Sequence, residues 1–153
     1  MKLLWWIRRD LRLHDNPAIA YARENGCAIQ PIYIHAPDEE APWQPGAASN
    51  WWLRESLKKL QAELRSQDVD LWVANGDSED ILLTLLAGRA FSGVIWNRLY
   101  EPAIVARDRR VAAKVLEAGH FAKAFPGHLL REPHQVRKGD GSPYRVFTPY
   151  WKA

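Results

Sequence analysis

The sequence predicts an α/β fold: a Rossmann-like, doubly wound, five-stranded parallel sheet with helices on both faces. Short apolar runs, which are typical of buried strands, alternate with segments of helical periodicity roughly every 15 to 20 residues. The chain has 153 residues, enough for one domain with a real hydrophobic core. Right-handed crossovers between parallel strands would then place the helices on both faces of the sheet.

Five segments are predicted as strands. Residues 2–8 form a continuous apolar and aromatic run, as expected for a parallel strand that is covered on both faces. Residues 28–35 form the second, although Pro31 lacks the amide hydrogen that a ladder needs, which argues against regular pairing in its first half. The other three are residues 69–74, 94–97 and 121–125.

Four helices are predicted between these strands. The first begins at Asn16 and Pro17, a capping side chain followed by a residue suited to the first turn, and ends at Gly26. The third begins at Ser78 with acidic residues in its first turn, and the fourth runs from residue 101 to 119. The second spans residues 49–67, where four leucines are spaced by four, three and four: Leu53, Leu57, Leu60 and Leu64.

Two stretches are predicted to be irregular. Residues 36–46 contain three prolines, and no periodicity persists from Leu129 onward. This tail carries four aromatic residues that would invite a partner if exposed: Tyr144, Phe147, Tyr150 and Trp151. The alternative is that these aromatic side chains fold back onto the sheet.

Composition excludes several classes of protein. A single cysteine, Cys27, rules out a disulfide framework and a cysteine-rich zinc site. No apolar run approaches the roughly 20 residues that span a bilayer, and the apolar N-terminus is too short for a signal peptide, so the expected compartment is a reducing cytosol. The net charge of +3 is mild and dispersed, and gives little support for a polyanion-binding arm.

The common catalytic motifs are absent. The sequence has no glycine-rich dinucleotide fingerprint, no phosphate-binding P-loop, no nucleophile elbow and no pair of histidines at metal-ligand spacing, so no catalytic or metal-binding residue is predicted. Residues 76–78, Gly-Asp-Ser, could offer backbone amides to a phosphate at a helix start, as in a standalone nucleotide-binding module. An ordinary turn between a strand and a helix is the favoured interpretation.

A dense charged constellation follows the first strand instead. Residues 8–15 contain three arginines, two aspartates and a histidine, and they form the first loop between a strand and a helix. Ligands of open α/β sheets bind at the carboxyl ends of the strands, where this loop lies. The arginines are expected to fix the loop by pairing with Asp10 and Asp15, and one of them could face an anionic or polar ligand.

These residues open an ordered set of five motifs that resembles the DNA photolyase and cryptochrome family. The motifs are RRDLRLHDNP at residues 8–17, GAASNWWLRESL at 46–57, NGD at 75–77, WNRLYEP at 96–102 and PYRVFTPYWK at 143–152. The resemblance implies an N-terminal Rossmann-like domain that holds a light-harvesting antenna chromophore. It implies a separate C-terminal helical domain that binds FAD and the DNA lesion.

The activity implied by the resemblance is that of a deoxyribodipyrimidine photo-lyase, a carbon–carbon lyase of DNA repair. Blue or near-UV light absorbed by the antenna excites reduced FAD, which splits a cyclobutane pyrimidine dimer flipped out of the duplex. We therefore expect residues 1–130 to form the antenna domain and residues 131–153 to begin the connection to the helical domain. The expected partners are that domain and, for the parent enzyme, UV-damaged DNA, with no membrane. The chain by itself is not expected to be catalytic.

A cryptochrome-type blue-light photoreceptor, whose output is partner binding, is the alternative from another functional class. In relatives with a deazaflavin antenna, the resemblance places the chromophore contacts at eight positions of this sequence: Arg9, Tyr33, Ile34, His35, Ser49, Trp52, Tyr100 and Glu101. Tyr33 and Trp52 could offer flat apolar surface, and Arg9 or Glu101 could bond polar ring edges. Plain core packing remains the alternative for Tyr33, Ile34 and Trp52.

The sequence departs from the folate-binding relatives at one place. Those relatives carry an Asn-Glu pair where this chain has Ala103 and Ile104, whose side chains cannot hydrogen-bond a pterin. A deazaflavin, FMN, a folate held in another way, or no antenna at all therefore remain open.

Overall fold

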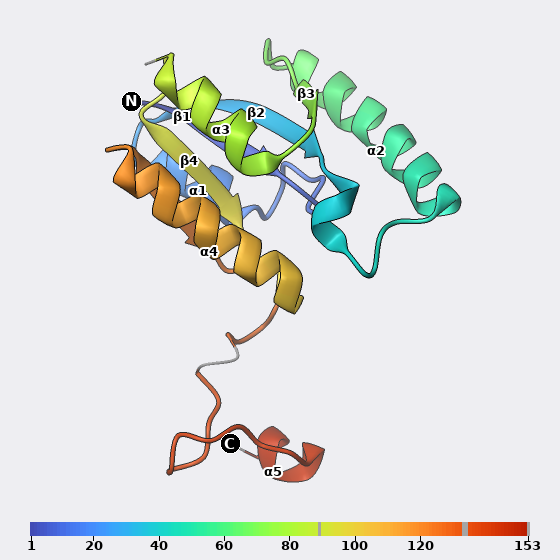
Figure 1. The fold of residues 1–153 in the computed structure, drawn as a ribbon, viewed down its shortest axis with the longest axis vertical. Helices are drawn as coiled ribbons and strands as arrows, with labels where there is room; N and C mark the ends of the chain where they lie inside the picture. Colours follow the sequence, from blue (N-terminus) through green and yellow to red (C-terminus); the bar gives the residue numbers. More distant parts are fainter. Residues whose placement is uncertain (89, 133–134, 153) are drawn as a thin grey trace.

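A computed structural model describes residues 1–88, 90–132 and 135–152 and confirms the predicted five-stranded parallel sheet (Figure 1). The strand order is β3-β2-β1-β4-β5. The strands are β1 (Lys2–Ile7), β2 (Ala28–His35), β3 (Trp72–Asn75), β4 (Gly93–Asn97) and β5 (Phe121–Phe125). The helices are α1 (Pro17–Glu24), the short 3₁₀ turn η1 (Pro37–Glu40), α2 (Ala47–Arg65), α3 (Ser78–Ala87), α4 (Pro102–Glu117) and α5 (Phe147–Trp151).

The central strand β1 is buried on both faces, and successive side chains enter two separate cores. Leu4 and Trp6 lie in one core with residues of α3 and α4. Leu3, Trp5 and Ile7 lie in the other core with residues of α1 and the C-terminal half of α2. This period-two alternation explains why the strand reads as a continuous apolar run rather than as an amphipathic one.

Capping hydrogen bonds between neighbouring residues fix where α1 and α3 begin. The Asn16 side chain accepts the backbone N–H of Ile19 at 3.3 Å, and Pro17 opens α1. The Asp77 side chain accepts the N–H groups of Glu79 and Asp80 at 2.8 and 3.0 Å at the start of α3. The capped start of α1 and the acidic first turn of α3 follow the sequence prediction, whereas the Asp77 cap was not predicted.

Pro31 does not interrupt its strand. It pairs with Trp5 of β1, and the pairing of β2 with β3 begins only at Ile32 and Trp72. Pro31 therefore lies at a local edge on the side of β3, where a missing amide hydrogen costs no ladder bond. The strand predicted over residues 28–35 is therefore confirmed, with Pro31 inside it.

The strand predicted to start at residue 69 begins three residues later. Asp68 adopts a left-handed conformation with φ of 58°, and the Val69 N–H donates to the Leu64 carbonyl at 3.1 Å. This turn uses residues 66–69 to satisfy the last carbonyls of α2. Only from Trp72 is the chain extended beside β2.

Both stretches predicted to be irregular contain a short helix. Pro37 presets the backbone angle for η1 within residues 36–46. In α5 the residue Pro149 falls in the first turn, where a helix leaves its N–H groups unpaired in any case. Neither element has the apolar period by which longer helices are recognised.

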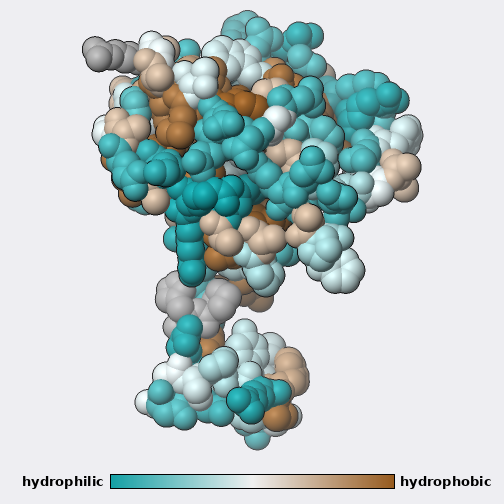
Figure 2. All heavy atoms as spheres, viewed as in Figure 1, coloured by the Kyte–Doolittle hydropathy of each residue, from teal (hydrophilic) through white to brown (hydrophobic). Residues whose placement is uncertain are grey.

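The segment around α5 stands apart from the sheet (Figure 1), and Figure 2 shows it as a separate lobe. Its aromatic rings contact one another, as Phe147 stacks on Trp151 with ring centroids 5.9 Å apart. Phe147, Tyr150 and Trp151 are all exposed. The tail aromatics therefore do not fold back onto the sheet.

The close approach of β4 and β5 at Gly93 leads to a stability prediction. A Cβ atom at Gly93 would lie 2.6 Å from the Phe121 Cβ and closer still to its backbone oxygen. We expect Gly93→Ala to lower the free energy of unfolding by about 2 kcal/mol, the cost of overpacking a close contact. Urea denaturation followed by circular dichroism measures this change.

Gly88→Ala is the matched control, because its new Cβ would meet only the Leu85 carbonyl oxygen at 3.5 Å, an ordinary contact. Its stability should stay level or rise by up to ~1 kcal/mol, since alanine restricts the unfolded chain. Equal stability of the two variants would contradict the close approach of the strands.

Candidate functional site

A cavity of about 750 Å³ opens at the carboxyl ends of β1 and β2. This size is typical of sites for small molecules and cofactors. Its walls come from the loop after β1, the end of β2, η1, the N-terminal half of α2 and one side chain of α4. The lining residues are Trp6, Arg8, Arg9, Asp10, Leu11, Arg12, Tyr33, Ile34, His35, Ala36, Pro37, Glu40, Pro45, Ala48, Ser49, Trp52, Leu53, Ser56 and Arg107.

The crevice between β1 and β4, where the strand order reverses, is filled by protein side chains. The Asn97 side-chain amide donates to Asp10 at 2.5 Å and to Asn16 at 2.9 Å. Its oxygen accepts the N–H of Ala18 at 3.1 Å. A ligand at the usual switch point would have to displace this network, so the open space lies one strand further, at β1 and β2.

The arginines of the first loop do not pair with the aspartates predicted for them. Arg12 donates to the backbone carbonyl of Asp15, at 3.0 and 3.1 Å, and not to its carboxylate. The Asp10 side chain accepts from the two asparagines above and from the backbone N–H of Arg8. The expected pairing was wrong because Arg8 and Arg9 find acidic partners far along the chain.

Arg8 belongs to a buried charged cluster beside the cavity. It donates to Asp108 at 2.7 Å, and Arg107 donates to the same carboxylate at 2.9 and 3.1 Å. Both guanidinium groups lie on the ring of Trp6, with centroid distances of 4.7 and 4.8 Å. Burial lowers the pKa of Arg8, and the Asp108 carboxylate opposes that shift.

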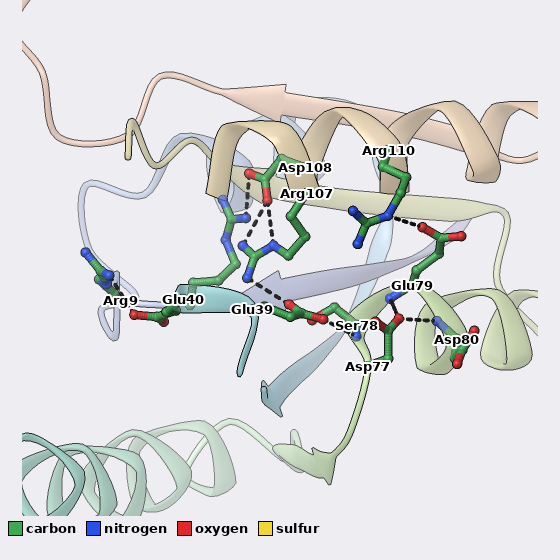
Figure 3. A network of polar contacts seen from close by, with 11 residues as sticks. Arg9, Glu39, Glu40, Asp77, Ser78, Glu79, Asp80, Arg107, Asp108 and Arg110 are labelled. Atoms are coloured by element: carbon green, nitrogen blue, oxygen red, sulfur yellow. Dashed lines mark hydrogen bonds and ion pairs between the residues drawn. The ribbon is translucent and has the colours of Figure 1, made fainter. Parts of the chain in front are cut away.

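A second set of charges joins α4 to the turn η1, as Figure 3 shows. Arg107 donates to Glu39 at 3.0 Å. Glu39 also accepts the N–H and the hydroxyl of Ser78 at 2.7 and 2.8 Å. The start of α3 is therefore already occupied by a carboxylate, which disfavours the phosphate site considered for residues 76–78.

Arg9 lies at the rim of the cavity between two carboxylates. It donates to Glu40 of η1 at 2.8 Å and to Glu101 at the start of α4. The Arg9 side chain is about half exposed, so it can also reach a bound molecule. Burial would lower the pKa of Arg9, but the two carboxylates raise it above its ordinary value.

Aromatic and apolar surface completes the cavity. Trp52 lines it and is 70% exposed, whereas Ile34 lines it and is buried in the core. Tyr33 is half-buried, and the described residues offer its hydroxyl no hydrogen bond. Ile34 is therefore mainly a core residue, whereas the ring of Trp52 is exposed at the mouth of the cavity.

Six of the eight predicted contact residues line this cavity, and two do not. Glu101 reaches the cavity only through Arg9. Tyr100 lines a different cavity, of about 580 Å³, and donates its hydroxyl to the buried Glu132 at 2.7 Å. Sequence reasoning missed Glu40 and Arg107, because nothing in a proline-rich loop or a helix interior marks a side chain as lining a cavity.

Two further findings concern the described residues. Within residues 1–88, 90–132 and 135–152, no cluster of three or more His, Cys, Asp or Glu side chains could hold a metal ion. No helix in the described part of the chain is long and apolar enough to cross a membrane.

Comparison with known proteins gives one family. The family model described as DNA photolyase matches residues 3–153. The chain is 39% identical over 148 residues to a deoxyribodipyrimidine photo-lyase of Agrobacterium fabrum, covering 97% of this chain and 30% of that protein. It is 36% identical over 152 residues to Cryptochrome-2 of Arabidopsis thaliana, covering 99% of this chain and 25% of that protein.

Solved structures agree with this family. A class III photolyase from Agrobacterium tumefaciens superposes with a TM-score of 0.87 at 38% identity, covering 99% of this chain and 31% of that one. An archaeal photolyase from Sulfolobus tokodaii superposes with a TM-score of 0.83 at 27% identity, covering 99% and 34%. That archaeal protein is described with two FAD molecules and an implied novel light-harvesting cofactor. The chain thus spans about a third or less of the length of these relatives.

The surroundings of Tyr33 predict a pH dependence. Burial, followed by the charge of Glu40, raises the pKa of Tyr33 from 10.0 to about 12. Between these values the unfolded chain releases the tyrosine proton while the folded chain keeps it, so this group lowers stability as the pH rises from 10 to 12. Phenolate absorbance of the wild type minus that of Tyr33→Phe measures the folded pKa. If the midpoint of this difference titration fell at the ordinary tyrosine pKa, the hydroxyl of Tyr33 would not be shielded from water.

Proposed function

The chain belongs to the DNA photolyase family, and we propose that it is the part of such a protein that holds a light-harvesting antenna chromophore. The observation that carries this proposal is the cavity at the carboxyl ends of β1 and β2. Its volume suits a small cofactor, and six residues at the antenna-contact positions line it.

The chemistry of the lining fits a flat heteroaromatic molecule with polar edges. Trp52 offers an exposed ring for stacking at the mouth. Arg9 and the Tyr33 hydroxyl offer hydrogen-bond donors at the rim and the wall. Such a group would supply absorption of blue or near-UV light, and the protein's part is to orient it and shield it from water.

The class of chromophore is narrowed by the start of α4. Ala103 is exposed and Ile104 is buried in the protein interior, so neither side chain offers a hydrogen bond to a pterin. This supports a deazaflavin or FMN over a folate in the pose of the folate-binding relatives. A folate held elsewhere in the cavity stays a candidate.

For the whole protein we propose light-driven repair of DNA. Relatives that cover nearly all of this chain are deoxyribodipyrimidine photo-lyases. In this proposal reduced FAD, bound by a separate helical domain, splits cyclobutane pyrimidine dimers, while this chain collects light and is not catalytic by itself. A cryptochrome-type photoreceptor is the second candidate, favoured by the 36% identity to Cryptochrome-2 of Arabidopsis thaliana. The residues around the flavin in the helical domain would separate the two.

We also propose that residues 1–130 form the antenna domain and residues 131–153 begin the connection to the FAD-binding domain. The exposed aromatic side chains of α5 and their separation from the sheet support this division (Figure 2). In the connected protein these rings would pack against the helical domain.

Titration of the purified chain tests the proposed antenna site. We expect one of three chromophores, deazaflavin, FMN or methenyltetrahydrofolate, to give a saturable shift in absorbance and fluorescence. Absence of binding to all three, by this chain and by a full-length protein that contains it, would overturn the proposed function.

Arg9 and Glu101 are expected to contribute unequally to that affinity. Arg9→Ala should weaken binding about tenfold, as expected for a charge-assisted bond worth about 1.4 kcal/mol. Glu101→Ala should weaken it less, because Glu101 acts through Arg9. Fluorescence titration measures both, and Arg110→Ala, which removes an exposed pair with Glu79 away from the cavity, is the control. Equal affinity of Arg9→Ala and the wild type would remove Arg9 from the site.

The tail predicts a pattern of amide hydrogen exchange. Backbone amides from Pro143 onward should exchange fast in the isolated chain, because α5 is one short turn without buried side chains. Amides of β1 and β4, which are buried, should exchange slowly in the same experiment and serve as its internal reference. Slow exchange in the tail would show that it docks onto its own domain.

A further inference from the structure

The turn η1 forms one wall of the cavity, yet it has little of its own to hold it in place. None of its four residues is fully buried, and no side chain caps it. The side chain of Glu39 nevertheless points inward and is only 11% exposed. A wall this short needs an anchor elsewhere in the protein, because a single 3₁₀ turn is not stable by itself.

Glu39 supplies that anchor through both carboxylate oxygens. Oε1 accepts the Ser78 N–H at 2.7 Å, and Oε2 accepts the Ser78 hydroxyl at 2.8 Å and Arg107 at 3.0 Å. The two partners lie on different elements, the first turn of α3 and the middle of α4. Three donors, one of them charged, thus fix one carboxylate at a single point.

Arg107, the charged partner of Glu39, is itself held by several other contacts. Two nitrogens of Arg107 are held by Asp108 at 2.9 and 3.1 Å, and its guanidinium group lies on the Trp6 ring. Asp108 is held in turn by Arg8 at 2.7 Å. A shift of Glu39 would therefore require the buried cluster to rearrange.

The neighbouring residue Glu40 points the other way. It lines the cavity and accepts from Arg9 at 2.8 Å, whereas Glu39 points toward α3 and α4 (Figure 3). Ala36 and Pro37, at the start of the turn, also line the cavity. The side of η1 that carries Glu39 is thus anchored to α3 and α4, and the side that carries Glu40 faces the cavity. The position of Glu39 therefore sets the position of Glu40.

We propose that Glu39 is the positioning residue of the chromophore cavity: fixed by Ser78 and Arg107, it holds η1 so that Glu40 orients Arg9 toward the bound ring system. Glu39 does not line the cavity and touches no ligand there. This inference rests on the proposed antenna function.

The test compares Glu39→Gln with the wild type in titrations with deazaflavin, FMN and methenyltetrahydrofolate. Glutamine has nearly the same shape, but its NH₂ group must face one of the donors that the carboxylate accepts. We expect at least tenfold weaker binding of the chromophore that the wild type takes up. We also expect lower fluorescence anisotropy of the molecules that remain bound, because the wall that orients Arg9 is loose.

Two controls separate positioning from a general loss of stability. Glu24→Gln makes the same chemical change on an exposed glutamate of α1, away from η1. Val115→Ala shortens a core side chain of α4, so it lowers the free energy of unfolding without changing a residue of η1. Both should bind within twofold of the wild type under conditions where circular dichroism shows all variants folded. Binding of Glu39→Gln at wild-type strength, or a loss matched by Val115→Ala, would overturn the proposal.

Amide hydrogen exchange tests the inference independently of the proposed function. Glu39→Gln should speed exchange in residues 36–45 and in the first turn of α3, and neither control should do so. If the wild type binds none of the three chromophores, the antenna function fails while this exchange pattern still decides whether Glu39 holds the wall. Unchanged exchange in residues 36–45 would refute the anchoring role.

Discussion

Two guanidinium groups lie on the ring of Trp6, and the carboxylate of Asp108 is what allows both of them to be buried there. A buried cation without a partner costs several kcal/mol. Asp108 pairs with both arginines, whereas Glu39 pairs with Arg107 alone. Arg8 continues β1, and Arg107 and Asp108 belong to α4. The cluster therefore joins the central strand of the sheet to the helix that covers it, at the end where the site lies.

The position of the cavity follows from this constraint. Asn97, Asp10 and Asn16 fill the reversal point of the sheet, and the charged cluster closes the space beside it. Ligands of open α/β sheets bind at the carboxyl ends of strands, and the ends of β1 and β2 beside this point offer open space. The N-terminal half of α2 lies away from the core, since the buried residues of this helix are Leu60 and Leu64, and so leaves room beside β2.

The fold could be predicted almost completely from the sequence, because periodicity and capping residues act locally. Asn16 and Pro17 mark the start of α1, and the acidic first turn after Ser78 marks the start of α3, by chemistry that needs no tertiary contact. The motifs also led to the family, and with it to six side chains that line one cavity. The partners of Arg8 and Arg9 could not be predicted, since Asp108 and Glu101 lie about 90 to 100 residues away and many acidic residues compete. The contact of Tyr100 with Glu132 could not be predicted for a similar reason, because Glu132 lies beyond the last strand.

The Trp6 ring has one more neighbour, Trp96, with centroids 5.8 Å apart and planes tilted by 58°. Two indoles at this distance and tilt couple their electronic transitions, and the coupling depends steeply on their mutual orientation. Because both guanidinium groups lie on the Trp6 ring, we expect a rearrangement of the charged cluster to change the orientation of that ring relative to Trp96. We therefore expect the Trp6–Trp96 pair to contribute a coupled band to the circular dichroism of the tryptophans, and this band would change with the arrangement of the charged cluster.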